Sequence, residues 1–167
     1  MITLKQFMTE LFDKPIKGAN KTYGIKKIRQ TISDSENRLH KYKFKVPGDI
    51  DHSLVHIKHS PNAKSAEVIF KTPDIEGGHT TNQTGDYGSS SVRVFSPVSH
   101  IMRVHAKKHP ELKHFIIGAK GSEPSRVRLY DTISRRMGGK HQSEKNGVHY
   151  FKLPINQNWH ATVHHQD

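Results

Sequence analysis

The sequence predicts an α/β (α+β) domain built on a mixed, mostly antiparallel sheet flanked by helices. Three observations predict it: strand-like alternation before residue 72, two amphipathic segments with helix caps after residue 90, and a short apolar strand between them. The 167 residues suffice for one domain with a hydrophobic core. We place this domain at residues 39–155, after a basic linker at 14–38 and before a polar tail at 156–167.

The first thirteen residues predict a short amphipathic helix, because apolar residues recur at near-helical spacing until Pro15 drives the chain out of the α region. One interpretation is a terminal helix docked on the core. Another comes from the residue types at Met1, Thr3, Phe7, Met8 and Glu10. With them the segment resembles the capsid-targeting sequence of T-even-type phage head proteins, and Glu10 would be the residue after which a prohead protease cuts. The linker that follows holds at most one weak helix, around residues 25–32.

The first half of the domain is expected to be an antiparallel meander. Residues 40–46 alternate strictly between apolar and basic side chains, so Tyr42, Phe44 and Val46 share one face of a strand. Residues 54–58 and 66–71 have the composition of two further strands. The glycine-rich residues 72–90 then predict a long loop.

The second half begins with a brief strand expected at residues 92–95. Ser96 and Pro97 then predict the start of a helix, with serine as the N-cap and proline at the first helical position, and Pro110 stops it. The continuously apolar residues 115–119 predict a buried central strand.

A second helix is expected to open at Ser122-Glu123-Pro124 and to close at Gly138-Gly139, the usual C-terminal glycine position. The last strand is expected at residues 148–153. The side chains spaced for the buried face of the helix are Val127, Tyr130, Ile133 and Met137.

The run Arg128-Leu129-Tyr130-Asp131-Thr132-Ile133, followed by Gly138, resembles the last-helix signature of the GNAT (Gcn5-related N-acetyltransferase) family. The expected element order of residues 40–153 also resembles that fold. The resemblance implies a GNAT-like sheet with an acyl-CoA groove where two central strands part, and Tyr130 as the general acid that protonates the departing thiolate. The alternative for Tyr130 is a core tyrosine on the apolar face of its helix.

The pyrophosphate-binding loop of the family has a looser counterpart here. Gln83, Gly85 and Gly88 have its residue types with different spacing, and Ser96 would cap the helix that follows. Phe95 and Pro97 stand immediately before that expected helix, where they would obstruct close backbone approach to a phosphate. We therefore expect a degenerate, non-catalytic relative without a cofactor, and acetyl-CoA only if the acyltransferase alternative holds.

A second resemblance involves Val94-Phe95 and the Glu-Pro-Ser-Arg-x-x-Leu-Tyr segment at residues 123–130. These residues resemble a set of uncharacterised tailed-phage proteins with no established activity. The resemblance implies a virion protein, located in the particle or in the host cytoplasm.

The charge of the chain favours a polyanionic partner. Lysine and arginine number 27 against 15 acidic residues, a formal net charge of +12. Phosphate contacts need only positive stripes, and no ribonucleoprotein or helix-turn-helix motif is present, so any DNA binding should be sequence-independent. The alternative is a solvated basic surface. The candidate phosphate contacts are Lys41, Lys43, Lys45, Arg103, Lys107, Arg128, Arg135 and Arg136.

The chain has 14 histidines and no cysteine. Cysteine chemistry is therefore excluded, and no His-Glu-x-x-His motif is present. His52, His56 and His59 form one group, on an expected strand where the spacing does not converge, and His105 and His109 form another. We interpret the histidines as scattered surface residues and predict no metal site.

No apolar run is long enough for a transmembrane helix, no signal-peptide pattern is present, and we expect a soluble protein that does not use a membrane. No P-loop, nucleophile elbow or glycosidase-type acid pair supports a kinase or hydrolase. The leading hypothesis is a basic, virion-associated phage protein that associates with packaged DNA or with the particle. The alternatives are an acetyl-CoA-dependent N-acyltransferase and a structural head or tail component whose partners are virion proteins.

Overall fold

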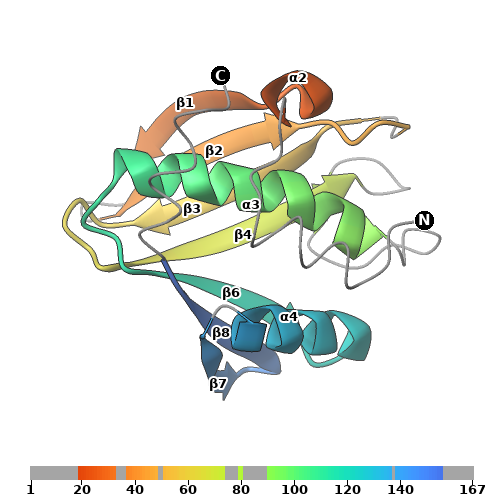
Figure 1. The fold of residues 1–167 in the computed structure, drawn as a ribbon, viewed down its shortest axis with the longest axis vertical. Coiled ribbons are helices and arrows are strands. Elements are labelled where there is room, and N and C mark those ends of the chain that lie inside the picture. The colour runs from red at the N-terminus through yellow and green to blue at the C-terminus, as the bar shows by residue number, and fades with distance from the viewer. Residues whose placement is uncertain are drawn as a thin grey trace.

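The computed structural model describes residues 19–32, 37–48, 51–73, 79–80, 90–136 and 138–155 (Figure 1). The helices are α2 (Ala19–Tyr23), α3 (Ser90–Lys108) and α4 (Pro124–Arg136). The strands are β1 (Lys26–Ile32), β2 (Arg38–Phe44), β3 (Ser53–His59), β4 (Ser65–Pro73), β5 (His79–Thr80), β6 (His114–Lys120), β7 (Lys140–Lys145) and β8 (Val148–Pro154). The predicted helix at residues 1–13, the predicted cleavage site Glu10 and the predicted tail at 156–167 lie outside the described residues.

The strands form a sheet in the order β1-β2-β3-β4-β6-β8-β7, and β5 pairs with β4 off this path. Neighbouring strands are antiparallel except β4 and β6, which run parallel. The helix α3 is the crossover between these two strands, as a parallel pair requires. The predicted α+β class, a mixed and mostly antiparallel sheet flanked by helices, is confirmed.

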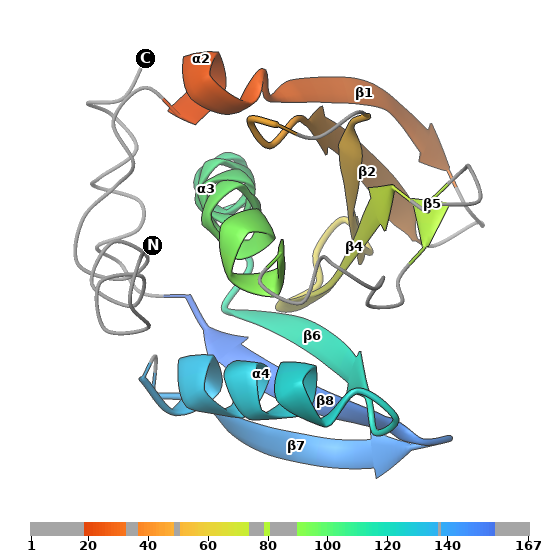
Figure 2. The same cartoon turned by 90° about the vertical axis from the view of Figure 1, so that its right-hand side faces the viewer.

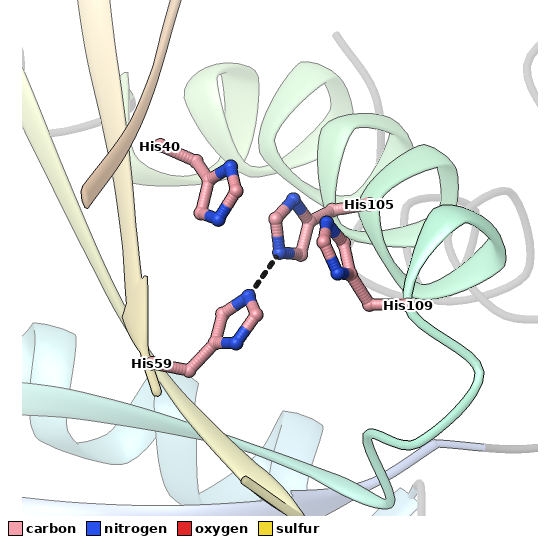
Figure 3. A group of neighbouring side chains, drawn as sticks. All are labelled: His40, His59, His105 and His109. Atoms are coloured by element: carbon pink, nitrogen blue, oxygen red, sulfur yellow. Dashed lines mark hydrogen bonds between the residues drawn. The ribbon is translucent and has the colours of Figure 1, made fainter. Parts of the chain in front are cut away.

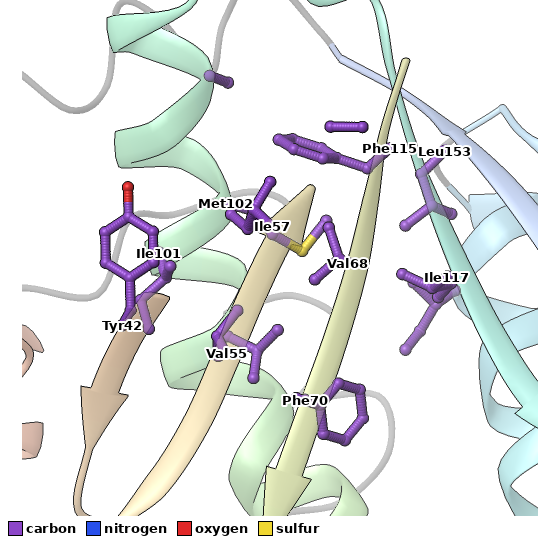
Figure 4. Packing of buried hydrophobic residues seen from close by; sticks show 14 of the residues in the cluster. Tyr42, Val55, Ile57, Val68, Phe70, Ile101, Met102, Phe115, Ile117 and Leu153 are labelled. Atoms are coloured by element: carbon purple, nitrogen blue, oxygen red, sulfur yellow. The ribbon is translucent and has the colours of Figure 1, made fainter. Parts of the chain in front are cut away.

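Both long helices lie on the inner side of a curved sheet (Figure 2). Ile101 and Met102 of α3 pack among the buried side chains of β2, β3 and β4 (Figure 4). Tyr130 of α4 contacts Phe70 of β4, with ring centroids 5.9 Å apart, and Phe151 of β8, at 6.4 Å. The strand register puts Phe70 and Phe151 on the face that α3 covers. No described helix therefore covers the opposite face, which we call the outer face.

The parallel strands part before they end. Their pairing runs from Ser65 opposite His114 to Val68 opposite Ile117. Beyond this point β4 continues to Pro73 and β6 to Lys120, and an open space between them reaches towards α4. The sheet thus divides at its middle, between β4 and β6.

Most of the predicted elements are confirmed with small changes at their ends: β2, β3, β4, β6, α4 and β8. Gly138 ends α4 at φ 78°, and the Gly139 N–H donates to the Ser134 carbonyl at 2.7 Å, the hydrogen bond of a Schellman cap. A side chain at Gly139 would collide with the Lys152 carbonyl, so glycine is also required in the connection between α4 and β7.

Three predictions of secondary structure were wrong, besides the omission of two short elements, α2 in the predicted linker and β5 in the predicted loop. Residues 25–32 do not form a weak helix; β1 occupies them because Lys26 and Ile28 pair with Lys43 and Lys41 of β2, and this long-range pairing outweighs local propensity. Part of the segment predicted as a linker therefore belongs to the sheet.

The strand expected at residues 92–95 belongs to α3, which begins at Ser90 and contains Pro97 in its interior. A proline inside a helix removes one i→i−4 hydrogen bond, and the helix survives here with Val98, Ile101 and Met102 fully buried just after it. The third error was the omission of β7. This polar strand pairs with β8 through a tight turn at Asn146-Gly147, whose φ angles of 53° and 76° fit the primed turns of hairpins.

Among the described residues, no helix is long and apolar enough to cross a membrane.

Candidate functional site

A cavity of about 150 Å³ lies where β4 and β6 part. It reaches from the outer face of the sheet through to α4 on the inner side. The residues that line it are Glu67, Val68, Ile69 and Phe70 of β4, Gly118 and Lys120 of β6, Glu123, Arg126 and Tyr130 at α4, and Val148 and Tyr150 of β8.

Tyr130 is both a core residue and a wall of this cavity. Its side chain is 1% exposed, and burial, the largest cause, raises the pKa of its hydroxyl above the ordinary value. The hydroxyl therefore stays protonated at neutral pH. The resemblance to acyltransferases and the core-tyrosine alternative both fit this placement, and the role of Tyr130 as a general acid stays a prediction.

Charged groups stand beside Tyr130 at the start of α4. Arg126 Nη1 lies 3.2 Å from Glu123 Oε2, and both side chains are largely buried. The Arg126 guanidinium also lies 5.7 Å from the centre of the Phe70 ring. A buried ion pair of this kind is costly to desolvate. Its position in the wall of the cavity gives that wall charged groups at fixed positions.

The predicted pyrophosphate loop is only partly visible. Gln83, Gly85 and Gly88 lie outside the described residues. Ser96 is not an N-cap, because α3 begins at Ser90 and Ser96 lies in its interior. Phe95 and Pro97 consequently do not stand before the helix, and the expected obstruction to a phosphate at its start is wrong. One residue, Ser89, separates Gly88 from the helix.

The second candidate site is the outer face. Lys41 and Lys43 point away from the buried side chains of β2, and the register carries their face across the sheet to Lys26, Lys71 and other lysines. Each of these side chains reaches solvent. On the described parts of β2, β3, β4, β6 and β8, the one carboxylate on this face is Glu67. We name as the lysine face Lys26, Lys41, Lys43, Lys58, Lys71, Lys120 and Lys152.

The other predicted phosphate contacts divide between two sides of the molecule. Lys45 is exposed just beyond β2, near the lysine face. Arg103 is 4% exposed, so its prediction as a phosphate contact is wrong: it lies on the core side of α3. Lys107 lies half-buried on α3, while Arg128 and Arg135 are exposed on α4, where Arg135 Nε is 3.0 Å from Asp131. The Arg136 side chain lies outside the described part of the structure.

Four histidines from distant parts of the chain meet on the inner face (Figure 3). His40, His59 and His105 are 2%, 3% and 0% exposed, and His109 is partly exposed. The interpretation of the histidines as scattered surface residues is therefore wrong for this group. His52 and His56 do not join it, since His56 lies on the outer face of β3.

The positions of two of these histidines in their strands indicate the cluster. His40 has the same parity as Tyr42 and Phe44 on β2, and His59 the same parity as Val55 and Ile57 on β3. Both histidines therefore continue buried faces of adjacent strands. Grouping histidines by closeness in sequence concealed this pattern, because the partners lie on three separate elements.

No family model matches the chain, and no curated protein matches it. Among solved structures it is similar to the crystal structure of the N-acetyltransferase PseH from Campylobacter jejuni, with a TM-score of 0.39 and 15% sequence identity. The match covers 74% of this chain and 71% of that one.

Proposed function

We propose that this protein binds the backbone of duplex DNA through the lysine face, without sequence specificity, as a basic virion-associated protein. The observation that carries the proposal is the accumulation of lysines on a sheet face that no described helix covers. Lysine contributes a flexible point charge suited to phosphate, and such contacts fix no base sequence.

The register of the strands supports an anionic partner. Lys26 stands directly opposite Lys43, and like charges paired across strands destabilise a sheet. A phosphate backbone laid over the face would relieve this repulsion. The half-buried Ile28, Leu39, Leu54 and Ile69 lie between the lysines, whose aliphatic stems can cover apolar surface while their ammonium groups stay in water.

The test is fluorescence anisotropy with a labelled DNA duplex over a range of salt concentrations. The Lys41→Gln/Lys43→Gln double variant should bind more weakly, and the slope of log K against log salt should fall in magnitude by about 1.8, since each phosphate contact contributes about 0.9. The matched control is Arg128→Gln/Arg135→Gln, which removes the same charge from exposed positions on α4. Equal losses in the two variants would contradict a dedicated face.

The assignment to a virion is supported by the resemblances at residues 1–10 and 123–130 alone. Mass spectrometry of purified particles would detect the chain and show whether it is cleaved after Glu10. A chain incorporated in fixed ratio whose DNA affinity does not exceed that of a neutral protein would favour the structural alternative, with a protein interface in place of DNA.

A second candidate is an acyl-CoA-dependent N-acyltransferase. Two observations favour it: the cavity between the parted strands, with Tyr130 in its wall, and the start of α3 directly after the glycine-rich segment. Thermal unfolding with acetyl-CoA at low salt tests it, because ligand at about 100 times its dissociation constant adds roughly 2.7 kcal/mol. Tyr130→Phe should then keep the thermal shift and lose turnover. An unchanged unfolding temperature would exclude this candidate.

A further inference from the structure

The inner-face histidine cluster, defined as His40, His59, His105 and His109, has the composition and the spacing of a metal site. One ring nitrogen from each residue can be chosen so that all four lie within 4.8 Å of one another. The six distances between the ring centroids fall between 4.3 and 5.1 Å. We propose that these four histidines bind one zinc ion, which ties the C-terminal end of α3 to strands β2 and β3.

The backbone places the four residues without special loops. His105 lies in the last turns of α3, and His109, four residues later, lies above the same helix face, with its N–H donating to the His105 carbonyl at 3.0 Å. His40 and His59 lie on adjacent strands, one register step apart, since Arg38 pairs with His59 and His40 with Ile57. The cluster therefore spans three elements of the core rather than one flexible segment.

Three of the rings are held by their Nδ1 atoms, which leaves Nε2 for the ion. His59 Nδ1 donates to the Ser60 carbonyl at 2.8 Å, and His109 Nδ1 donates to Glu111 Oε1 at 3.3 Å. His105 Nδ1 lies 2.9 Å from the Tyr42 hydroxyl. Histidines that bind metals usually donate the other ring N–H to a carbonyl, a carboxylate or another oxygen in this way, which fixes the tautomer and the direction of the ring.

The contact between His59 and His105 shows what the metal would replace. Their Nε2 atoms are 2.8 Å apart. His59 must keep its proton on Nδ1 for Ser60, so in the metal-free protein His105 Nε2–H donates to His59 and Tyr42 donates to His105 Nδ1. When an ion binds, the His105 proton moves to Nδ1 and the Tyr42 hydroxyl accepts it. The step exchanges the Nε2–H bond of His105 for an Nδ1–H bond, and the other changes are confined to hydrogen bonds.

His40 is the ring that most needs a ligand. It is 2% exposed, and neither of its ring nitrogens has a hydrogen-bond partner. A buried polar group without a partner destabilises the fold, whereas a metal–nitrogen bond would satisfy it. The His40 ring meets the other three edge-on or stacked at 4.6 to 5.1 Å, so it faces the centre of the cluster.

The protonation state of the cluster suits a cation. Burial is the first cause that lowers the pKa of His105 to about 2 and of His40 to about 4, with further contributions from the neighbouring histidines and Lys27. Their lone pairs are therefore available at neutral pH. Lys27 opposes the charge of the ion, and Glu111, behind His109, offsets it.

Four imidazoles and no thiolate or carboxylate ligand suit zinc in tetrahedral geometry. Zinc–nitrogen bonds of 2.0–2.1 Å place ligand nitrogens about 3.3 Å apart, so the rings need move only by about an ångström. Four protein ligands close the coordination sphere, which is the pattern of structural rather than catalytic zinc. His109, on the partly exposed side of the cluster, offers the ion its route in.

The test begins with chelator-treated full-length protein, to which Zn²⁺ or Co²⁺ is added. We expect one equivalent to bind, a rise in the unfolding temperature, and intense visible absorption from Co²⁺, which is the signature of tetrahedral coordination. His109→Gln, a change at the partly exposed ligand, should leave the circular dichroism spectrum unchanged and weaken binding at least tenfold. Glu111→Gln should weaken it less, because the ligand itself remains.

The matched control is His56→Gln on the outer face of β3, the same strand that carries His59. It should bind zinc as the unaltered chain does. His164 and His165, adjacent in sequence, are one source of adventitious metal binding, and the comparison of the two variants excludes it. No binding, octahedral Co²⁺ spectra, or equal affinity in His109→Gln and the unaltered protein would each overturn the proposal.

Discussion

At the scale of single residues, His105 sits at the centre of a buried polar network. Its two ring nitrogens contact the Tyr42 hydroxyl and His59 Nε2, and the side chain is fully buried. Burial also raises the pKa of Tyr42 to about 12, so the hydroxyl remains a neutral partner that can donate or accept. Networks of this kind stabilise one arrangement of a core when every member is satisfied, and destabilise it when a charge appears within them.

Acid should therefore unfold the metal-free protein through this cluster. The unfolded chain protonates its histidines near pH 6.5, whereas the folded protein keeps His40 neutral to about pH 4 and His105 to about pH 2. Below pH 6.5 the unfolded state binds more protons, so the free energy of unfolding decreases as the pH is lowered, by up to about 1.4 kcal/mol per pH unit for each histidine. The stability from these two residues is complete above pH 6.5 and declines as the pH falls, towards about pH 4 for His40 and about pH 2 for His105.

Urea unfolding at a series of pH values, with a chelator present, measures this slope. His40→Gln should reduce the slope by up to about 1.4 kcal/mol per pH unit, whatever its effect on overall stability. His56→Gln, which removes a histidine outside the cluster, should keep the slope of the unaltered chain. A slope that is the same in all three proteins would mean that the cluster does not control acid unfolding.

The strict alternation of apolar and basic side chains at residues 40–46 is the most informative pattern in the sequence. It placed Lys41 and Lys43 on one face of β2 and Tyr42 and Phe44 on the other, and both placements are confirmed. The same alternation assigns His40 to the buried face. A histidine has no strong preference for core or surface, so composition suggested the surface, and only the partners on β3 and α3 decide the matter.

At the scale of elements, the start of α3 has the largest consequence for function. Serine followed by proline is a common helix start, and it placed the first helical residue seven residues too late, at Pro97 in place of Ser90. The sequence could not reveal this, because proline is disfavoured inside a helix by local rules and only tertiary packing compensates for it. With α3 beginning at Ser90, one residue separates Gly88 from the helix in the sequence, and acyl-CoA binding stays a candidate.

The two longer strands that the sequence did not predict, β1 and β7, have different explanations. Nothing local predicted β1, whose pairing with β2 is a contact between distant parts of the chain. In contrast, Asn146-Gly147 is a strong hairpin signal that lies between β7 and the correctly predicted β8. The polar composition of β7 concealed it, as expected for a strand at the edge of a sheet, where polar and charged side chains discourage pairing with other molecules.

At the scale of the whole molecule, the sheet separates two chemistries. The histidine cluster lies on its inner face beneath α3, and the lysine face lies on its outer side. His40 and Lys41 are neighbours in β2, yet their side chains point to opposite sides of the sheet. The proposed zinc site and the proposed DNA surface therefore share strand β2 but no residue.

This separation predicts that the two binding events are nearly independent. At about 0.1 M salt the Debye length is about 10 Å, and the sheet itself intervenes between the ion and a phosphate on the outer face. One equivalent of zinc should therefore change the affinity for duplex DNA by less than about twofold, and by thermodynamic reciprocity DNA should change the affinity for zinc equally little. The measurement is DNA anisotropy with zinc-loaded and chelator-treated protein, with His109→Gln as the control for zinc bound elsewhere. A tenfold increase in DNA affinity on loading, absent in His109→Gln, would instead place the DNA on the α3 side of the molecule. The lysine face would then not be the principal contact.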